Sequence, residues 1–159
     1  MDSPELARYK EVAGHFATGV TVVTAMVDGE PVGFTCQSFA SLSLEPLLVG
    51  FAARSASSSW PKVREAGLLA INILDDDSEA LGRAFATSGT DKFAGVAHHP
   101  GPNGAPILDA TLAVITADII AVHAVGDHDY AVARVGTATS RHGKPLLYFR
   151  GGFGTFTSD

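Results

Sequence analysis

Three short segments combine residue types that suit ligand binding better than core packing. The first is residues 33–43, GFTCQSFASLS, a strand-like run crowded with small and hydroxyl-bearing side chains. Such side chains leave backbone N–H and C=O groups accessible to a flat ligand. An edge strand with one solvated face would have the same composition, so this segment alone leaves both interpretations open.

The second segment is residues 54–61, RSASSSWP, in which serines precede a proline that suits the first turn of a helix. Free N–H groups at a helix start carry partial positive charge, and with the serines and Arg54 they can hold a phosphate. An ordinary serine-capped helix gives the same pattern. The third segment, Gly126-Asp127-His128, places a histidine after a tight turn between two predicted strands, where a plain hairpin connection is the alternative.

Several chemical motifs are missing from the sequence. It has no G-x-G-x-x-G, no Walker A loop, no C-x-x-C, no H-E-x-x-H and no G-x-S-x-G. These absences argue against a Rossmann domain, a P-loop NTPase, common zinc sites and α/β-hydrolases. His98 and His99 are adjacent, which is a poor geometry for two ligands of one metal. With His123 and His128 they are interpreted as loop and edge-strand residues, and no metal is predicted.

The elements that position these segments are mostly strands. Ser3 and Pro4 open a helix that Gly19 ends, and β-branched, apolar runs follow. The predicted strands are residues 20–27, 34–43, 47–53, 68–74, 111–125, 130–139 and 145–149. Short helices are predicted within residues 57–67, with Pro61 as the first helical residue, and from about residue 76 to 86, where Asp76 and Glu79 resemble a capping box.

Many strands with few long helices predict a mainly β fold, a closed barrel with short helices plugging its ends. Residues 88–110 are rich in Gly, Pro, Asp and His and have no clear period, which predicts a long loop of the kind that is often functional. The length of 159 residues predicts a single domain, residues 1–159.

Composition limits the class of protein. Hydrophobic residues make up 46% and charged residues 18%, as in globular proteins, and the net charge of −6 argues against a nucleic-acid partner. Cys36 is the only cysteine, which excludes an internal disulfide. No secretory signal is visible, and residues 111–125, interrupted by Asp118 and His123, are too short to span a bilayer. We therefore expect a cytoplasmic protein with no membrane partner.

In this order and at these separations, the segments resemble the short-chain flavin reductases, the reductase components of two-component flavin-dependent monooxygenases. The resemblance covers nearly the whole chain, and each motif is short while the ordered set is specific. The motifs are FATGVTVVT at residues 16–24, GFT and SF within residues 33–39, SLSLEP at 41–46, DKFAGV at 91–96, GDH at 126–128 and PLLY at 145–148.

The resemblance implies an antiparallel Greek-key FMN-binding split β-barrel, usually a homodimer with flavin near the interface. It implies an NAD(P)H:flavin oxidoreductase that transfers hydride to FMN or FAD and supplies reduced flavin to a separate monooxygenase. The sequence does not choose between FMN and FAD, or between NADH and NADPH. It also leaves open whether the flavin is a prosthetic group or a substrate.

The resemblance assigns site residues as well. The residues expected along the isoalloxazine ring are Thr35, Cys36, Gln37, Ser38 and Phe39. The residues expected around the flavin phosphate are Ser55, Ser57, Ser58 and Ser59. Lys92 and Phe93 match a motif near the ribityl and phosphate end, His128 matches a histidine beside the nicotinamide, and Phe153 lies where the family has residues near the nicotinamide site. Cys36 stands where the family often has another small residue, so no redox role is assigned to it.

Two other classes remain as alternatives. A flavin-binding protein on the same fold, without useful nicotinamide oxidation, would not need the Gly126-Asp127-His128 segment at that point. A pyridoxamine-phosphate oxidase-like enzyme would need a further cluster of basic side chains for the substrate phosphate, and the sequence shows none.

Overall fold

The computed structural model describes residues 3–158, so Met1, Asp2 and Asp159, at the ends of the predicted domain, lie outside the described residues. The helices are α1 (Pro4–Ala13), α2 (Trp60–Ala66) and α3 (Glu79–Ala86). The strands are β1 (Thr18–Gly19), β2 (Thr21–Val27), β3 (Glu30–Cys36), β4 (Ala40–Leu44), β5 (Leu47–Arg54), β6 (Leu68–Leu74), β7 (His98–Pro100), β8 (Pro106–Leu108), β9 (Thr111–Val125), β10 (His128–Ser140), β11 (Leu146–Phe149) and β12 (Gly152–Thr155). Of the helices in this described part of the chain, none is long and apolar enough to cross a membrane.

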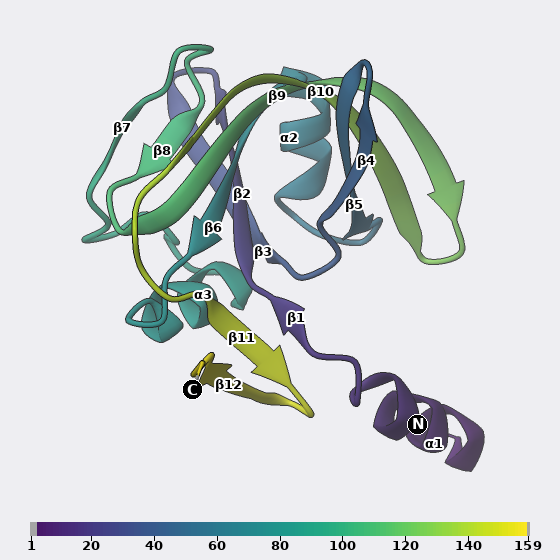
Figure 1. Ribbon diagram of the computed structural model, residues 1–159. Helices are drawn as coiled ribbons and strands as arrows, with labels where there is room; N and C mark the ends of the chain where they lie inside the picture. The colour runs from purple at the N-terminus through teal and green to yellow at the C-terminus, as the bar shows by residue number, and fades with distance from the viewer. Residues whose placement is uncertain (1–2, 159) are drawn as a thin grey trace.

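One seven-stranded antiparallel sheet dominates the molecule, in the order β3-β2-β6-β9-β10-β5-β4. Within this sheet, β9 and β10 form a long, curved hairpin, and α2 lies inside the curve of the hairpin (Figure 1). Smaller sheets join β1 with β11 and β12, and β7 with β8. The predicted mainly β, antiparallel fold with short helices is confirmed.

Alternate residues of β2 point into two different hydrophobic clusters, as the period of a strand requires. Val23 and Ala25 belong to the main cluster inside the curved sheet, whereas Val22, with Val20 just before the strand, belongs to a second cluster that includes Phe85 of α3. Trp60 of α2 is 1% exposed and closes the main cluster. Both faces of β2 are buried over residues 21–25, so apolar residues there do not alternate with exposed polar ones, and the two threonines in this stretch are buried as well.

Several predicted boundaries are wrong, and the strand expected to begin at residue 34 begins at Glu30. The first helix ends at Ala13 instead of near Gly19, and β1 follows because it pairs with β11. The strand predicted at residues 34–43 is divided into β3 and β4 by a bend at residues 37–39. The predicted loop at residues 88–110 contains the short hairpin of β7 and β8.

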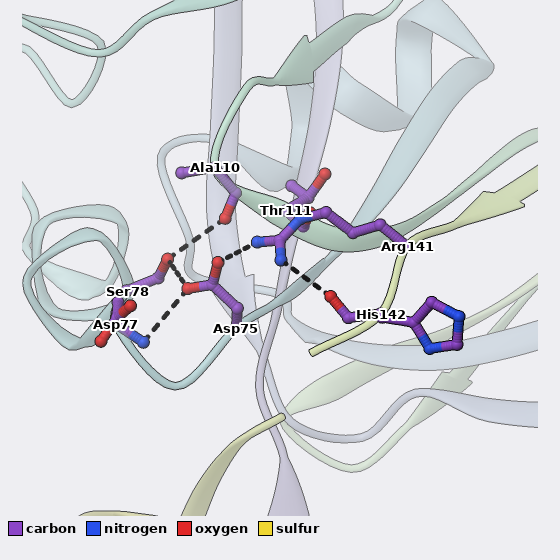
Figure 2. A network of polar contacts seen from close by, with 7 residues as sticks. All are labelled: Asp75, Asp77, Ser78, Ala110, Thr111, Arg141 and His142. Atoms are coloured by element: carbon purple, nitrogen blue, oxygen red, sulfur yellow. Dashed lines mark hydrogen bonds and ion pairs between the residues drawn. The ribbon is translucent and has the colours of Figure 1, made fainter. Parts of the chain in front are cut away.

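The start of α3 is fixed by a polar network rather than by the predicted capping box. The Asp75 carboxylate accepts hydrogen bonds from the Asp77 N–H at 3.1 Å and the Ser78 hydroxyl at 2.6 Å, and it forms an ion pair with Arg141 (Figure 2). Arg141 also donates to the Thr111 carbonyl at 2.8 Å. The helix begins after Ser78, so Glu79 lies in its first turn and does not close a box with Asp76. The network joins α3 to the ends of β6, β9 and β10.

Candidate flavin site at the split of the sheet

A cavity of about 550 Å³ opens where β3 and β5 face each other without pairing. Residues 34–38 form one wall and residues 52–54 form the opposite wall. Phe85 and Lys92 close one side, and His128 lies at the start of the strand that pairs with β5. This volume is typical of cavities that hold a small organic ligand or cofactor.

The bend after β3 is tied to β5 by the side chain of Ser38. Its hydroxyl accepts from the Ala52 N–H at 2.7 Å and donates to the Ala52 carbonyl at 2.9 Å. The Cys36 sulfur lies 3.2 Å from the same hydroxyl, and burial raises the pKa of the Cys36 thiol. Ser38 therefore bridges the split through protein contacts, and Gln37 is left as the exposed polar side chain of this wall.

Thr35 anchors the helix that forms the side of the cavity. Its hydroxyl donates to the Gly82 carbonyl of α3 at 2.6 Å. This contact fixes α3 next to β3 and brings Phe85 to the cavity, where its ring packs edge-on against Phe93 at 4.9 Å. The Thr35 hydroxyl thus positions the wall, because its one hydrogen is already donated.

The serine-rich segment forms a capped helix start next to two cationic side chains. The Ser57 hydroxyl accepts from the N–H groups of Ser59 and Trp60, both at 3.2 Å, so two of the N–H groups expected to face a phosphate already have a partner. A hydroxyl that accepts two bonds still has its hydrogen to donate. Trp60 is the first helical residue, so Pro61 lies one position later than predicted.

Two cations, Arg54 and Lys92, line the same cavity. The Lys92 Nζ donates to the Gly33 carbonyl at 3.3 Å and to the Ser59 hydroxyl at 3.2 Å. Burial lowers the pKa of Lys92, because desolvation disfavours its charged form. An anionic group in the cavity would find one exposed guanidinium and one partly desolvated ammonium.

His128 is held at the cavity edge by its neighbour Asp127. Its Nδ1 lies 2.7 Å from the Asp127 Oδ1, and this hydrogen bond is the main cause that lowers the pKa of the Asp127 carboxyl. An ionised carboxylate accepts only, so Nδ1 carries the hydrogen and Nε2 faces away as the nitrogen available to a ligand. His128 on β10 is paired with Arg54 on β5, and this register fixes where the imidazole lies along the cavity edge.

The structure brings many of the predicted site residues together. Those that line the cavity are Thr35, Cys36, Gln37, Ser38, Ser57, Lys92 and His128. Ser58, Ser59 and Phe93 line a second cavity of about 230 Å³, which shares Lys92 with the first.

Three predicted residues line neither cavity. Phe39 packs against the main core cluster, and Ser55 is exposed and bonded through its N–H to the Asp127 carbonyl. Phe153 lies in β12 against Tyr148, with the Arg83 guanidinium 4.8 Å above its ring.

Sequence reasoning missed Ala52 and Ala53 on β5 and Phe85 and Ser88 near α3. Ala52 is a signal that could have been used, because a small, half-buried residue follows the bulky run of β5 at the cavity wall, whereas Ala53 belongs to the main core cluster. Nothing local marks Phe85 or Ser88, which the topology alone brings to the site. Within residues 3–158, no group of three His, Cys, Asp or Glu side chains could hold a metal ion.

Comparison with known proteins matches residues 13–157 to the model of the flavin reductase like domain. The chain belongs to the flavin reductase-like family. It is 43% identical over 145 residues to the reductase subunit HsaB of a flavin-dependent monooxygenase from Rhodococcus jostii, covering 91% of this chain and 74% of that protein. It is 38% identical to the FMN reductase (NADH) SmoA of Agrobacterium fabrum, covering 94% and 85% of the two chains.

A solved structure shows the same fold. The Streptomyces globisporus NADH:FAD oxidoreductase SgcE6, solved with NAD and FAD fragments, superposes with a TM-score of 0.92 and 31% identity, covering 100% of this chain and 98% of that one. The predicted family and its split-barrel fold are confirmed, and this chain is a flavin reductase of that family.

The residues of the cavity fit a flavin. Residues 52–54 of β5 line the cavity opposite residues 34–38, and Arg54, Ser57 and Lys92 supply the donors that a flavin phosphate requires. The fit rests on the donor set and the shape of the cavity of this flavin reductase.

Proposed function

We propose that this chain oxidises NADH or NADPH at the cavity edge marked by His128 and reduces FMN or FAD held between β3 and β5, releasing the reduced flavin to a separate monooxygenase. The observation that carries this proposal is that one cavity combines a phosphate-binding donor set with an imidazole whose Nδ1 is fixed by Asp127. A protein that only stored flavin would not need the second feature.

The protein groups act by positioning. Arg54, Ser57 and Lys92 hold the phosphate, while the Ser38 bridge keeps the two walls at a fixed separation. His128 offers Nε2 to the carboxamide of the nicotinamide, and we assign it no proton transfer. A bound flavin supplies the hydride acceptor, so the chain need only bring the two rings into contact and then let both leave.

The test is an anaerobic assay of the purified protein with excess FMN or FAD and, separately, NADH or NADPH. Bleaching of the flavin absorbance well beyond one equivalent is the expected result, because a reductase of free flavin turns over. Flavin that binds and is never bleached by either nicotinamide would overturn the proposal in favour of a flavin-binding protein on this fold. The same assay ranks the cofactor pairs.

The assembly and location of the protein are part of the same proposal. We expect a homodimer, since the described helix α1 buries none of its residues against its own chain. We also expect the protein to work in the cytoplasm, where reduced nicotinamides are available. Its partner would be a flavin-dependent monooxygenase, as the name of the R. jostii relative states for that protein.

A further inference from the structure

The second cavity brings a further cationic side chain beside the flavin site proposed above. It adjoins the first cavity at Lys92 and is lined by a second ammonium, Lys62 on α2. Thr90 and the backbone of Gly89 also line it. Given the function proposed above, the cavity affects whether the chain binds FMN or FAD.

The positive charge of this cavity is only partly balanced by the described residues of the protein. Among residues 3–158, neither Lys62 nor Lys92 has an ion-pair partner, and Lys92 is bonded only to the neutral acceptors on Gly33 and Ser59. One carboxylate, Asp91, lines the cavity, and its Oδ1 accepts from the Phe93 N–H at 3.3 Å. Two ammonium groups against one carboxylate leave the site with a positive balance.

The position of the cavity decides between ligands. His128, which marks the proposed nicotinamide edge, lines the first cavity alone, whereas Lys92, a proposed ligand of the flavin phosphate, lines both cavities. The group that enters the second cavity is therefore an extension of the flavin and not of the nicotinamide. At about 230 Å³ it has room for a sugar phosphate but not for a second tricyclic ring.

We propose that this second cavity binds the adenylate phosphate and ribose of FAD, with Lys62 as the residue that distinguishes FAD from FMN. Lys92 then stands between the two phosphates and contacts both halves of the dinucleotide. Lys62 reaches only the second half, because it lines the second cavity and not the first.

The test compares the dissociation constants of FMN and FAD by isothermal titration calorimetry for the wild type and Lys62→Gln. We expect Lys62→Gln to weaken FAD about three- to fivefold, as for one partly exposed charge contact, and to leave FMN unchanged. Lys62→Arg should retain FAD affinity. Lys144→Gln is the matched control, since it removes the same charge from an exposed position away from both cavities and should change neither constant.

The outcomes separate this inference from the proposed function. Equal weakening of FMN and FAD, or no change in either, overturns the FAD assignment while flavin binding stands. A rise in the KM for NADPH alone would assign the cavity to the nicotinamide 2′-phosphate and also overturn it. Failure of the wild type to bind either flavin would overturn both.

Discussion

His128 is the residue whose role is most sharply defined by its local contacts, because Asp127 holds Nδ1 and leaves Nε2 for a ligand. We expect His128→Ala to raise the KM for the nicotinamide on the order of tenfold, the loss of one hydrogen bond to a positioned ligand, while the dissociation constant of FMN stays the same. Steady-state kinetics and a flavin titration measure the two quantities. His99→Ala is the control, because His99 bonds Asp109 and lines neither cavity. An unchanged KM would remove His128 from the nicotinamide site.

Lys92 predicts a pH dependence of flavin binding. Burial lowers the pKa of its ammonium, so in the ligand-free protein it loses its proton at a lower pH than an ordinary lysine. The charge that attracts a phosphate is present below that lowered pKa and is lost as the pH rises through it. The affinity for FMN should therefore fall relative to that for riboflavin, which has no phosphate, as the pH rises toward the ordinary lysine range.

Lys92→Met provides the check on this pH effect. It should weaken FMN binding roughly five- to tenfold near pH 7, since a partly exposed charge-assisted contact is lost, and should flatten the pH dependence. Riboflavin binding should respond to neither change. The same fall of FMN affinity in Lys92→Met as in the wild type would show that another group titrates.

At the scale of elements, β3 depends on Gly33 for its close approach to β2 and α3. A Cβ added at Gly33 would lie 2.9 Å from the Val23 carbonyl oxygen and 3.1 Å from the Phe85 ring, and the backbone oxygen cannot move aside cheaply. Gly33→Ala should cost about 1–3 kcal/mol of the free energy of unfolding, as overpacking does, and should push Phe85 toward the cavity and weaken flavin binding. Urea denaturation measures the first effect. Gly19→Ala, which meets no atom within 4 Å, is the control, and equal midpoints for the two variants would contradict the packing argument.

The elements that could be predicted from the sequence are those decided by local pattern. Residues 68–74 and 111–125 were expected as strands and are β6 and β9 at the same boundaries, because β-branched, apolar runs need only neighbouring strands. The bend at residues 37–39 could not be predicted, since it depends on the bonds of Ser38 to Ala52, fourteen positions along the chain. The site residues also fall into those that a local motif reveals and those that only the fold brings to the cavity. Its motif residues were recognisable, whereas Phe85 reaches the cavity only through the contact of α3 with Thr35.

At the scale of the molecule, α1 buries none of its side chains in the core of its own chain. It is 10 residues long, none of them buried, and it stands away from the sheet (Figure 1). Isolated helices of this length are marginal in water, so packing against a partner must supply the missing stability. Tyr9 and Val12 on the helix and Phe16 beyond it are 68%, 64% and 80% exposed, which gives that partner an apolar surface to cover. A second copy of the chain is the partner that the proposed homodimer provides.

The dimer is tested by sedimentation. The wild type should sediment at about twice the chain mass of 16.5 kDa, and Phe16→Asp, which places a charge in the apolar surface, should shift the protein toward the monomer with the sheet still folded by circular dichroism. Thr139→Asp, an exposed position on β10, is the control and should leave the mass unchanged. A wild type that sediments as a monomer would show that a second copy of the chain does not cover α1. A Phe16→Asp variant that remains a dimer would place the interface elsewhere, and the exposed leucines of the β4–β5 turn, Leu44 and Leu47, would then be the next surface to charge, because they are 82% and 52% exposed.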